Sequence, residues 1–345
     1  MNRDEILNVG IVGLGYWGPN LLRNFLQIPL CRVKWICDID QDRVRKMQAN
    51  FHVACGTTNI GEILLDPEVH AVVNALPVSL HYRVSAEILK AGKHCMVEKP
   101  LAMTSAEAVE LIEMAESRSL TLMVGHTFEY NAAVMKVKEY IDSGEIGDIY
   151  YINCMRVNLG IIRHDVDALW TLAPHDISIL LNWLGVEPEG VSVLGACYLQ
   201  PDIADLVTAD LIFPGNRHAQ ILASWLNPEK IRKICVVGSK RMIVYDDVSL
   251  DQKIRIYDKH VDFSEPAETG EFGDFQLQIR TGDLVIPRLD FVEPLRTECS
   301  HFLDCCRTGQ KPLTDGRNGL RVVRVLEACS RSMRENGRYV RISEI

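Results

Sequence analysis

The sequence predicts an α/β protein of two domains: an N-terminal parallel sheet with helices on both faces, and a C-terminal α+β domain with a large, mostly antiparallel sheet. Two observations support this. Short apolar runs alternate with amphipathic helical segments in the first third of the chain, and strand-like runs then follow with few helices between them. With 345 residues, the chain is also longer than one core usually supports. We expect the domains to span residues 1–126 and 127–345, with the last helix able to pack back on the first domain.

The first domain is expected to contain five apolar runs that form parallel strands. Each run is preceded or followed by helical sequence, and this alternation is typical of βαβ units. The expected strands are NVGIVG, VKWICD, AVVNAL, HCMVE and LTLMVG.

The pattern changes after a helix expected over residues 132–143. Extended runs then follow at a spacing that indicates a mostly antiparallel sheet. One helix, over residues 174–184, interrupts the strands, and helices over residues 294–306 and 319–334 close the chain. The segment 264–285 is rich in Glu, Asp and Gly, so we expect it to be the least ordered part. The expected strands are IYYINCMRVN, GVSVLGACYL, LVTADLIF, HAQILASW, KICVVGS and RMIVYD.

A glycine-rich turn follows the first expected strand and precedes a helix. It has the form GxGxxG, with Gly13, Gly15 and Gly18 at the fixed positions and Tyr16 and Trp17 before the last glycine. The first glycine allows a tight turn, the second lets the backbone approach a pyrophosphate, and the third permits close packing of helix and strand. We predict that these five residues bind a dinucleotide. The alternative is a glycine turn without a ligand.

An acidic residue supports the dinucleotide interpretation. Asp38 ends the second expected strand, about 20 residues after Gly18, where a carboxylate accepts hydrogen bonds from a ribose diol. Because a carboxylate repels the 2′-phosphate of NADP, Asp38 favours NAD as the cofactor. Arg43 and Arg45 begin the next helix and could contact a phosphate, which keeps NADP as the alternative; they are otherwise solvated helix charges.

A lysine follows the HCMVE strand, in the tripeptide Glu98-Lys99-Pro100. In a parallel α/β sheet, ligands bind beyond the carboxyl ends of the strands, so the topology places Lys99 at the ligand edge. A lysine there could bond to a substrate hydroxyl near the nicotinamide. From position alone, a solvated loop lysine is an equal alternative.

Several segments, in this order, resemble the Gfo/Idh/MocA family of oxidoreductases. In the first domain they are GLGYWG, CDID, ALPVSLH and AGKHCMVEKPLA, and in the second they are APHDISIL, ASWLNPEKIRKICVVGSKRMIVYDD and GLRVVRVLEA. The resemblance covers essentially the whole chain and implies an N-terminal Rossmann domain. It also implies a homodimer or homotetramer, because the sheet of the second domain commonly packs against that of another subunit in this family.

The resemblance assigns roles to four residues of the first domain. It implies that Lys99 lies beside the nicotinamide and the reacting carbon and is catalytic as well as cofactor-binding. It further implies that Pro77 and His81 line the cofactor cleft and that Glu98 bonds to a ribose. For His81, a structural hydrogen bond at the start of a helix is the alternative.

The resemblance also implies a catalytic histidine in the second domain. The family has an Asp followed four residues later by a His; here His175 matches the histidine, and Thr171 stands where the aspartate is expected. A histidine can take a hydroxyl proton as hydride leaves the same carbon. Thr171 can bond to a substrate hydroxyl but carries no charge. Asp165, Asp167 or Asp176 could supply the missing carboxylate, and spacing alone does not choose among them.

Four residues are candidates for substrate binding. Arg156, near the end of an apolar strand, could hold a sugar carboxylate or phosphate in a bidentate fork. Tyr130, Asn131 and His164 offer hydrogen-bonding groups for sugar hydroxyls, with surface polar residues as the alternative. The segments around Arg156 and His175 resemble the branch of the family that acts on nucleotide-linked sugars.

Composition excludes several classes of protein. A formal charge of −9 and a pI near 5.6 argue against a nucleic-acid surface. No apolar run reaches the length of a membrane span, and nothing in the first residues suggests a signal peptide. The eleven cysteines are scattered without a CxxC pair, as in a reduced, cytoplasmic protein. We find no His/Cys/Asp group with metal-ligand spacing and expect no metal.

We therefore predict a cytoplasmic NAD-dependent dehydrogenase that transfers a hydride between nicotinamide and a ring hydroxyl of a sugar, with the 3-position of a nucleotide-linked sugar favoured. One alternative is an NAD-dependent glycosidase of the same fold, which uses transient oxidation to cleave a glycosidic bond. Another is a non-catalytic NAD-binding protein, for which Thr171 is the support.

Overall fold

The computed structural model describes residues 6–263 and 277–345. The chain forms two compact units. The first contains residues Met1–Asn131 and Val292–Glu327 together with Ile345, and the second contains Ala132–Phe291 and Ala328–Glu344. The predicted boundary at residue 126 is close to the end of the first stretch. Residues 292–327 also belong to the first unit, and they contain one whole helix, residues 294–308, and most of the last helix, residues 316–334. The predicted boundary assigned both helices to the second domain, although the last helix was expected to be able to pack back on the first.

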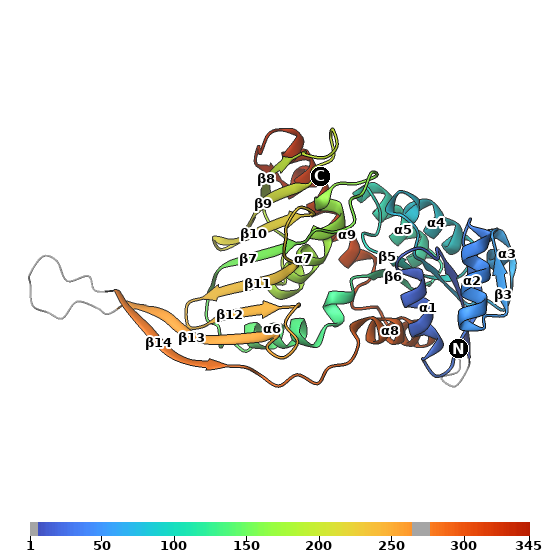
Figure 1. Cartoon of the computed structure of the whole chain (residues 1–345), viewed down its shortest axis with the longest axis horizontal. Coiled ribbons are helices and arrows are strands. Elements are labelled where there is room, and N and C mark those ends of the chain that lie inside the picture. The colour runs from blue at the N-terminus through green and yellow to red at the C-terminus, as the bar shows by residue number, and fades with distance from the viewer. Residues whose placement is uncertain (1–5, 264–276) are drawn as a thin grey trace, which may run out of the picture. The chain divides into compact units, whose positions relative to one another are not determined.

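The first unit contains a parallel sheet of six strands in the order β3-β2-β1-β4-β5-β6, with all five neighbouring pairs parallel (Figure 1). This is the strand order of a Rossmann fold, in which the chain reverses direction across the sheet between β1 and β4. The fold class predicted from the sequence is therefore confirmed for this part. The strands are β1 (Leu7–Val12), β2 (Cys31–Cys37), β3 (Cys55–Thr57), β4 (Ala71–Asn74), β5 (His94–Glu98) and β6 (Leu122–Gly125).

Helices cover both faces of this sheet because neighbouring strand residues point to opposite faces. Met96 and Met123 belong to one core cluster, whereas Val97 and Val124 belong to the other. The first cluster is covered by α1 (Gly18–Leu26), α2 (Gln41–Phe51) and α8 (Pro294–Thr308), and the second by α3 (Ile60–Leu65), α4 (His81–Lys90) and α5 (Ser105–Ser117). Burial on both faces explains why the strands appear in the sequence as continuous apolar runs.

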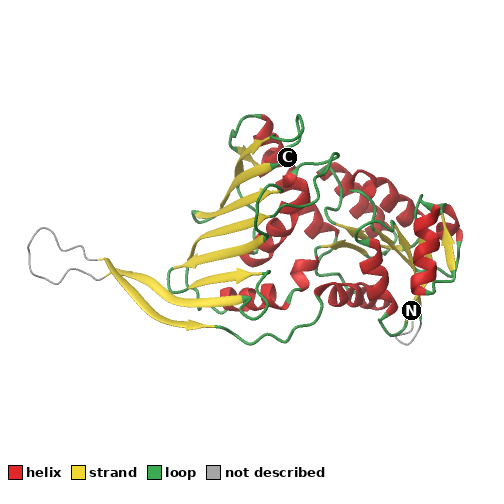
Figure 2. Ribbon diagram, in the orientation of Figure 1, coloured by secondary structure: helices red, strands yellow, loops and turns green. Residues whose placement is uncertain are grey.

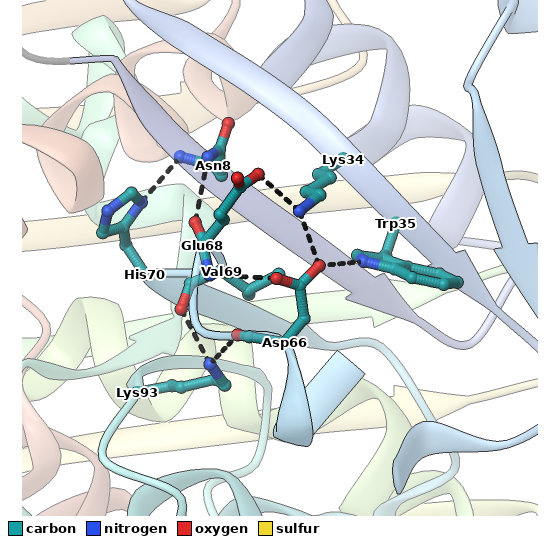
Figure 3. A network of polar contacts seen from close by, with 8 residues as sticks. All are labelled: Asn8, Lys34, Trp35, Asp66, Glu68, Val69, His70 and Lys93. Carbon is teal, nitrogen blue, oxygen red and sulfur yellow. Dashed lines mark hydrogen bonds and ion pairs between the residues drawn. The ribbon is translucent and has the colours of Figure 1, made fainter. Parts of the chain in front are cut away.

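A polar network lies at the amino-terminal side of this sheet (Figure 3). Lys93, just before β5, donates hydrogen bonds to the backbone carbonyls of Asp66 and Val69 over 2.7 and 2.8 Å. Lys34 and Trp35 of β2 both contact the carboxylate of Asp66, each over 2.7 Å. The network ties the loop before β4 to its neighbours, on the side of the sheet opposite to the glycine turn.

The second unit contains a nine-stranded sheet, counted over the described residues, in the order β14-β13-β12-β11-β7-β10-β9-β8-β15 (Figure 2). Every neighbouring pair is antiparallel except β7 with β10. The mostly antiparallel sheet predicted from the sequence is confirmed. The strands are β7 (Ile149–Val157), β8 (Gly190–Ala196), β9 (Leu206–Phe213), β10 (Arg217–Ser224), β11 (Ile231–Gly238), β12 (Met242–Asp246), β13 (Ile254–Phe263), β14 (Leu277–Val285) and β15 (Val340–Arg341).

Three helices belong wholly or partly to the second unit: α6 (Ala132–Asp142), α7 (Ala168–Leu184) and the last turns of α9 (Gly316–Arg334). Helix α7 packs on β7, β9 and β10. It starts earlier than predicted, because Asp167 caps its first turn and Pro174 lies inside it. The sequence predicted this helix over residues 174–184, whereas proline at an interior position does not end the helix here.

The predicted low order of the segment 264–285 is wrong for residues 277–285, which form β14 and pair with β13. Residues 264–276 lie outside the described part of the chain. The strand was missed because its order comes from pairing with a neighbour rather than from an apolar run, and Ile279 remains 81% exposed.

Candidate functional site

The glycine turn connects β1 to α1 at the carboxyl end of the sheet. Gly13 has a φ of +94°, and a Cβ atom there would lie 2.7 Å from the carbonyl oxygen of Ala75, so only glycine fits. A Cβ on Gly18 would collide with the carbonyl oxygen of Gly13. A Cβ on Gly15 would have no heavy atom of the described residues within 4 Å, when Gly15 itself and its two neighbours in the chain are left out. Two glycines are therefore required by the protein itself, and the third borders open space.

The amino end of α1 is left available for an anion. Within the described residues, no side chain caps this helix and its first turn carries no acidic residue. The helix dipole attracts negative charge to this end, where Pro19 has no N–H and the N–H groups of Asn20 and Leu21 donate to the carbonyl oxygen of Trp17. Tyr16 and Trp17, the two aromatic residues of the turn, lie edge to face at 5.9 Å and are 74% and 39% exposed.

Asp38 lies directly against the glycine turn. Its Oδ2 accepts a hydrogen bond from the backbone N–H of Leu14 over 2.7 Å, and its Oδ1 accepts one from the N–H of Asp40 over 2.9 Å. The residue is 6% exposed. The structure thus brings together the two features that the sequence analysis linked only through spacing.

Arg43 and Arg45, the basis of the NADP alternative, have acidic neighbours. Arg43 lies 3.8 Å from Oδ2 of Asp38 and 3.3 Å from Asp40, and Arg45 lies 3.7 Å from Asp42. Both side chains are more than half exposed. These contacts agree with their interpretation as solvated helix charges.

Pro77 and His81 follow β4, and the imidazole of His81 connects two loops at the carboxyl edge. Its Nδ1 lies 2.6 Å from the carbonyl oxygen of Pro100, and its Nε2 lies 2.8 Å from that of Leu76. Burial lowers the pKa of His81, and the nearby charge of Lys99 lowers it further. This geometry matches the structural alternative, since both ring nitrogens contact the backbone.

Glu98 is the last residue of β5, and Lys99 follows it at the same edge. The Oε2 of Glu98 accepts a hydrogen bond from the N–H of Lys99 over 3.3 Å, and the peptide between Lys99 and Pro100 is cis. Burial raises the pKa of Glu98 to about 7, although the charge of Lys99 opposes this shift. The carboxyl group is buried, so a role as a hydrogen-bond partner of a ribose stays a prediction.

Three buried polar residues near this edge were missed by the sequence analysis: His126, Glu129 and Glu298. His126 comes directly after β6, and burial together with the charge of Lys99 lowers its pKa to about 3. Glu298 lies in α8, where it interrupts the apolar stripe of Leu295, Cys299 and Phe302. A carboxylate within an apolar helix stripe, and a histidine directly after a buried strand, were the signals available in the sequence.

Tyr130 and Asn131, predicted to contact a sugar, are buried in the first unit. The hydroxyl of Tyr130 lies 3.1 Å from Oγ1 of Thr314, and its ring belongs to the apolar core cluster of α1 and α8. Asn131 is 4% exposed. Neither side chain presents a polar surface, so the structure offers no support for their predicted role.

In the second unit, Thr171 and His175 lie one turn apart on α7 and share a helix face. The Oγ1 of Thr171 donates to the carbonyl oxygens of Asp167 and Ala168, over 3.1 and 3.3 Å, and accepts from Nε1 of Trp225 over 3.2 Å. The hydroxyl is therefore held by the protein. His175 is partly exposed on the same helix.

The three aspartates considered as replacements for the family carboxylate are all engaged elsewhere. Asp165 forms a bidentate pair with Arg163, at 2.8 and 2.6 Å. Asp167 accepts the N–H of Trp170 as the cap of α7. Asp176 accepts two hydrogen bonds from the guanidinium of Arg156.

Arg156 was predicted to bind a charged group of the substrate, and the structure gives it a different partner. Its Nε and Nη2 donate to the two carboxylate oxygens of Asp176, both over 2.8 Å, and the residue is 3% exposed. The guanidinium lies between β7 and α7 on the covered face of the sheet. This geometry argues against the predicted role, because the fork that would hold a ligand already holds a carboxylate.

His164 lies in the loop before α7, where its Nδ1 lies 2.5 Å from Oε1 of Gln200. It is exposed, so it stays a candidate for contacts with a substrate. Among the described residues, no group of three or more His, Cys, Asp or Glu side chains could hold a metal ion. No helix in the described ranges is long and apolar enough to cross a membrane.

The residues of the first unit fit a dinucleotide. The open space beside Gly15 and the uncapped end of α1 suit a pyrophosphate, and the carboxylate of Asp38 has acceptor capacity left for ribose hydroxyls. By the topology of this fold, the reacting half of such a ligand would lie past the switch point between β1 and β4, at the carboxyl ends of the strands.

Comparison with known proteins gives two family matches. Residues 7–126 match the oxidoreductase family with an NAD-binding Rossmann fold, GFO/IDH/MocA, and residues 134–244 match a C-terminal domain of the same family. Together these two ranges cover more than half of the chain.

Individual relatives are distant but extend over most of the chain. A UDP-N-acetylglucosamine 3-dehydrogenase of Acidithiobacillus ferrooxidans is 27% identical over 252 residues, which are 73% of this chain and 77% of the relative. A myo-inositol 2-dehydrogenase of Thermotoga maritima is 24% identical over 354 residues, covering 98% of this chain and 99% of the relative. A solved structure of the Acidithiobacillus enzyme has a TM-score of 0.78 at 24% identity, covering 95% of this chain and 98% of that one.

Proposed function

Because the chain belongs to the GFO/IDH/MocA family of NAD-binding oxidoreductases, we propose that it transfers a hydride between nicotinamide and a ring hydroxyl of a sugar. A nucleotide-linked sugar, oxidised at the 3-position, is the substrate we favour. The observation that carries the cofactor half of this proposal is the hydrogen bond from Leu14 to Asp38, which joins the glycine turn to the ribose-binding carboxylate.

The part of the proposal that concerns the substrate is based on the relatives. One relative is named as acting on UDP-N-acetylglucosamine at the 3-position, and another on myo-inositol, a cyclic polyol. The relatives thus share oxidation of a ring CH–OH group. Identity below 30% does not carry a particular substrate over, so the nucleotide-linked sugar is our proposal.

The roles of the residues follow from their chemistry. When bound, the dinucleotide supplies a two-electron hydride acceptor or donor at its nicotinamide ring. Asp38 and the glycine turn hold its adenosine and pyrophosphate parts. Lys99 donates a hydrogen bond to the reacting oxygen, and His175 takes the hydroxyl proton during oxidation and returns it during reduction. Thr171 bonds the substrate or orients this helix face.

The experiment begins with a panel of UDP- and dTDP-sugars screened for thermal stabilisation in the presence of NADH. Sugars that stabilise the protein are then tested for turnover with NAD⁺. A dehydrogenase forms one NADH per ketone, whereas a glycosidase that uses transient oxidation releases a sugar without net NADH. Stabilisation by a sugar without any turnover would favour the non-catalytic alternative, which Thr171 and its engaged hydroxyl support.

A lysine variant tests the site directly. We expect Lys99→Ala to lower turnover by about 10² or more while NAD⁺ still binds, because the lysine contributes to proton transfer and to bonding of the reacting oxygen. Lys90→Ala is the matched control, since Lys90 is an exposed lysine at the end of α4. Equal turnover of Lys99→Ala and wild type would contradict a catalytic role for Lys99.

We also propose a homodimer or homotetramer in the cytoplasm. Exposed apolar side chains on the sheet of the second unit support an interface there, among them Tyr151, Leu194 and Ile279. All eleven cysteines are free thiols, as expected in a reducing compartment. Light scattering during size-exclusion chromatography tests the oligomeric state, and a monomer at micromolar concentration would contradict it.

A further inference from the structure

Two loops of the second unit expose large apolar side chains near the start of α7. One loop, residues 158–167, leads from β7 into the helix, and the other, residues 197–205, connects β8 to β9. Single exposed apolar residues are common on proteins, but a group of them in one place marks a binding surface. The exposed residues are Leu159, Ile161, Ile162, Tyr198 and Leu199.

One glutamine links the two loops. Nε2 of Gln200 donates a hydrogen bond to the carbonyl oxygen of Arg163 over 2.8 Å, and its Oε1 lies 2.5 Å from Nδ1 of His164. Residues 161–162 directly precede one end of this link, and residues 198–199 directly precede the other. The exposed apolar residues of the two loops are therefore close to one another.

A buried carboxylate holds the backbone of the second loop. Oδ2 of Asp205 accepts hydrogen bonds from the backbone N–H groups of Tyr198 and Leu199, over 2.7 and 2.9 Å, and Asp205 is 0% exposed. The carbonyl oxygen of Ala204 accepts the N–H of Ala168, the first residue of α7, over 2.9 Å. The second loop is thus fixed both to the sheet and to the start of the helix.

The first loop is connected to the helix face that carries Thr171. The N–H of Gly160 donates to the carbonyl oxygen of Trp225 over 3.3 Å, and Nε1 of Trp225 donates to Oγ1 of Thr171 over 3.2 Å. The backbone N–H of Trp225 donates to the carbonyl oxygen of Asp205 over 3.1 Å. Because Trp225 is buried, it supports both loops and the helix face at once.

The length of α7 separates the loops from His175 by a span that suits a nucleotide-linked sugar. His175 follows Asp167, the cap of the helix, by eight positions, and a helix rises 1.5 Å per residue, so the two residues are about 12 Å apart along the axis. A sugar bound at His175 therefore leaves the loops to the group that is attached to the sugar through phosphates.

The residues of the loops suit a planar base. The ring of Tyr198 is 66% exposed and offers a face for stacking, and the aliphatic side chains beside it offer apolar contact. The exposed imidazole of His164 supplies a hydrogen-bonding group for the edge of a base. Arg163, which would otherwise attract a phosphate, pairs with Asp165 at 2.8 and 2.6 Å. Stacking combined with hydrogen bonds at the edge is the usual way in which proteins hold an unpaired base.

We propose that residues 158–167 and 197–205 are base-binding loops, which hold the nucleobase of a nucleotide-linked sugar while the sugar lies at His175. The inference rests on the proposed function and deepens it, because it assigns the nucleotide part of the substrate to a surface of this chain. No bond forms or breaks at the loops, so they determine which substrates bind.

The test is isothermal titration of the full-length protein with UDP and with dTDP, in the presence of NADH. We expect at least one of the two nucleotides to bind wild type, and Tyr198→Ala to weaken this binding by about tenfold, because stacking on a base is lost. Tyr198→Phe keeps the ring and should recover most of the affinity. Leu250→Ala is the control, since Leu250 is an exposed apolar residue between β12 and β13, and it should bind the nucleotide as wild type does.

Three results would overturn the proposal. The first is a wild-type protein that binds neither nucleotide, and the second is equal nucleotide affinity of Tyr198→Ala and wild type. The third is a changed oligomeric state of Tyr198→Ala in light scattering, which would assign the apolar residues to a contact between copies of the chain.

A turnover assay separates this proposal from the proposed function. Formation of NADH from an unlinked sugar, by a protein that binds neither UDP nor dTDP, would overturn the base-binding loops and leave the dehydrogenase function standing. Nucleotide binding that depends on Tyr198, without NADH formation from any sugar, would support the loops and contradict the dehydrogenase function.

Discussion

The carboxylate of Asp38 accepts a hydrogen bond from the backbone N–H of Leu14 over 2.7 Å, which fixes it against the glycine turn. The second carboxylate oxygen is held by the N–H of Asp40. Each oxygen keeps a lone pair for a ribose hydroxyl, and the negative charge faces any group at the 2′-position. This arrangement supports the predicted preference for NAD over NADP.

We expect Asp38→Asn to weaken NAD⁺ binding and to narrow the preference over NADP⁺ by about tenfold to a hundredfold, since hydrogen bonds to a charged group are worth about 1.5–3 kcal/mol. Calorimetry with both cofactors measures this. Asp42→Asn is the control, because the Asp42 side chain is 93% exposed and pairs with Arg45. A wild-type protein that binds NADP⁺ as tightly as NAD⁺ would contradict the assignment of Asp38.

Gly15 and Gly13 of the turn give predictions that separate cofactor binding from stability. Gly15→Ala should change the free energy of unfolding by less than about 1 kcal/mol, because its Cβ meets open space and its φ suits an L-residue. The same methyl group occupies the space for the pyrophosphate, so NAD⁺ affinity should fall by about tenfold or more. Chemical denaturation and calorimetry on one preparation measure both effects.

Gly13→Ala is the contrasting variant. It should destabilise the fold by about 1–3 kcal/mol, because Gly13 has a φ of +94° and its Cβ would press on the carbonyl oxygen of Ala75. Unchanged NAD⁺ affinity in a well-folded Gly15→Ala protein would mean that the pyrophosphate does not bind at this turn.

The first unit could be predicted from the sequence because its determinants are local. Parallel strands buried on both faces appear as apolar runs, and the turn between β1 and α1 requires glycines at fixed positions. The carboxylate of Asp38 was found because it ends the next strand. Each of these signals lies within one βαβ unit.

The remaining parts depend on partners that are distant in the sequence. Arg156 was interpreted as a ligand-binding residue because Asp176, on another element, is not recognisable as its partner. The alternation of Ile152, Cys154 and Arg156 along β7 was the overlooked sign that Arg156 lies on the buried face. Glu298 was overlooked for a similar reason, since its hydrogen-bond partner Thr127 lies 171 residues earlier in the sequence.

The Arg156–Asp176 pair makes a prediction about stability. Arg156→Met leaves a buried carboxylate without its partner and should destabilise the second unit by about 3–5 kcal/mol. The double variant Arg156→Met, Asp176→Leu removes both charges and should recover much of this loss. Urea denaturation measures the three proteins.

The control for this pair is Arg163→Met. Arg163 and Asp165 form a partly exposed pair, with side-chain exposures of 39% and 38%, so we expect a loss of less than about 1 kcal/mol. If Arg156→Met were as stable as wild type and only its KM for the substrate were raised, the result would support the predicted substrate-binding role of Arg156.

The last prediction concerns Thr171, which stands where the family resemblance implies an aspartate. The three nearby aspartates each have another partner: Asp165 pairs with Arg163, Asp167 caps the start of α7, and Asp176 pairs with Arg156. Thr171→Asp restores a carboxylate one helical turn from His175, and a nearby negative charge favours the imidazolium. We therefore expect the pKa of His175 to rise in this variant. Since a general base must be unprotonated to accept the hydroxyl proton, the acidic limb of kcat/KM for oxidation should move to higher pH.

Thr171→Asn has the same shape without the charge and should leave the limb in place, while His175→Asn should lose most activity. An acidic limb that stays fixed in Thr171→Asp would show that residue 171 is not electrostatically coupled to the base, and full activity of His175→Asn would rule out His175 as that base.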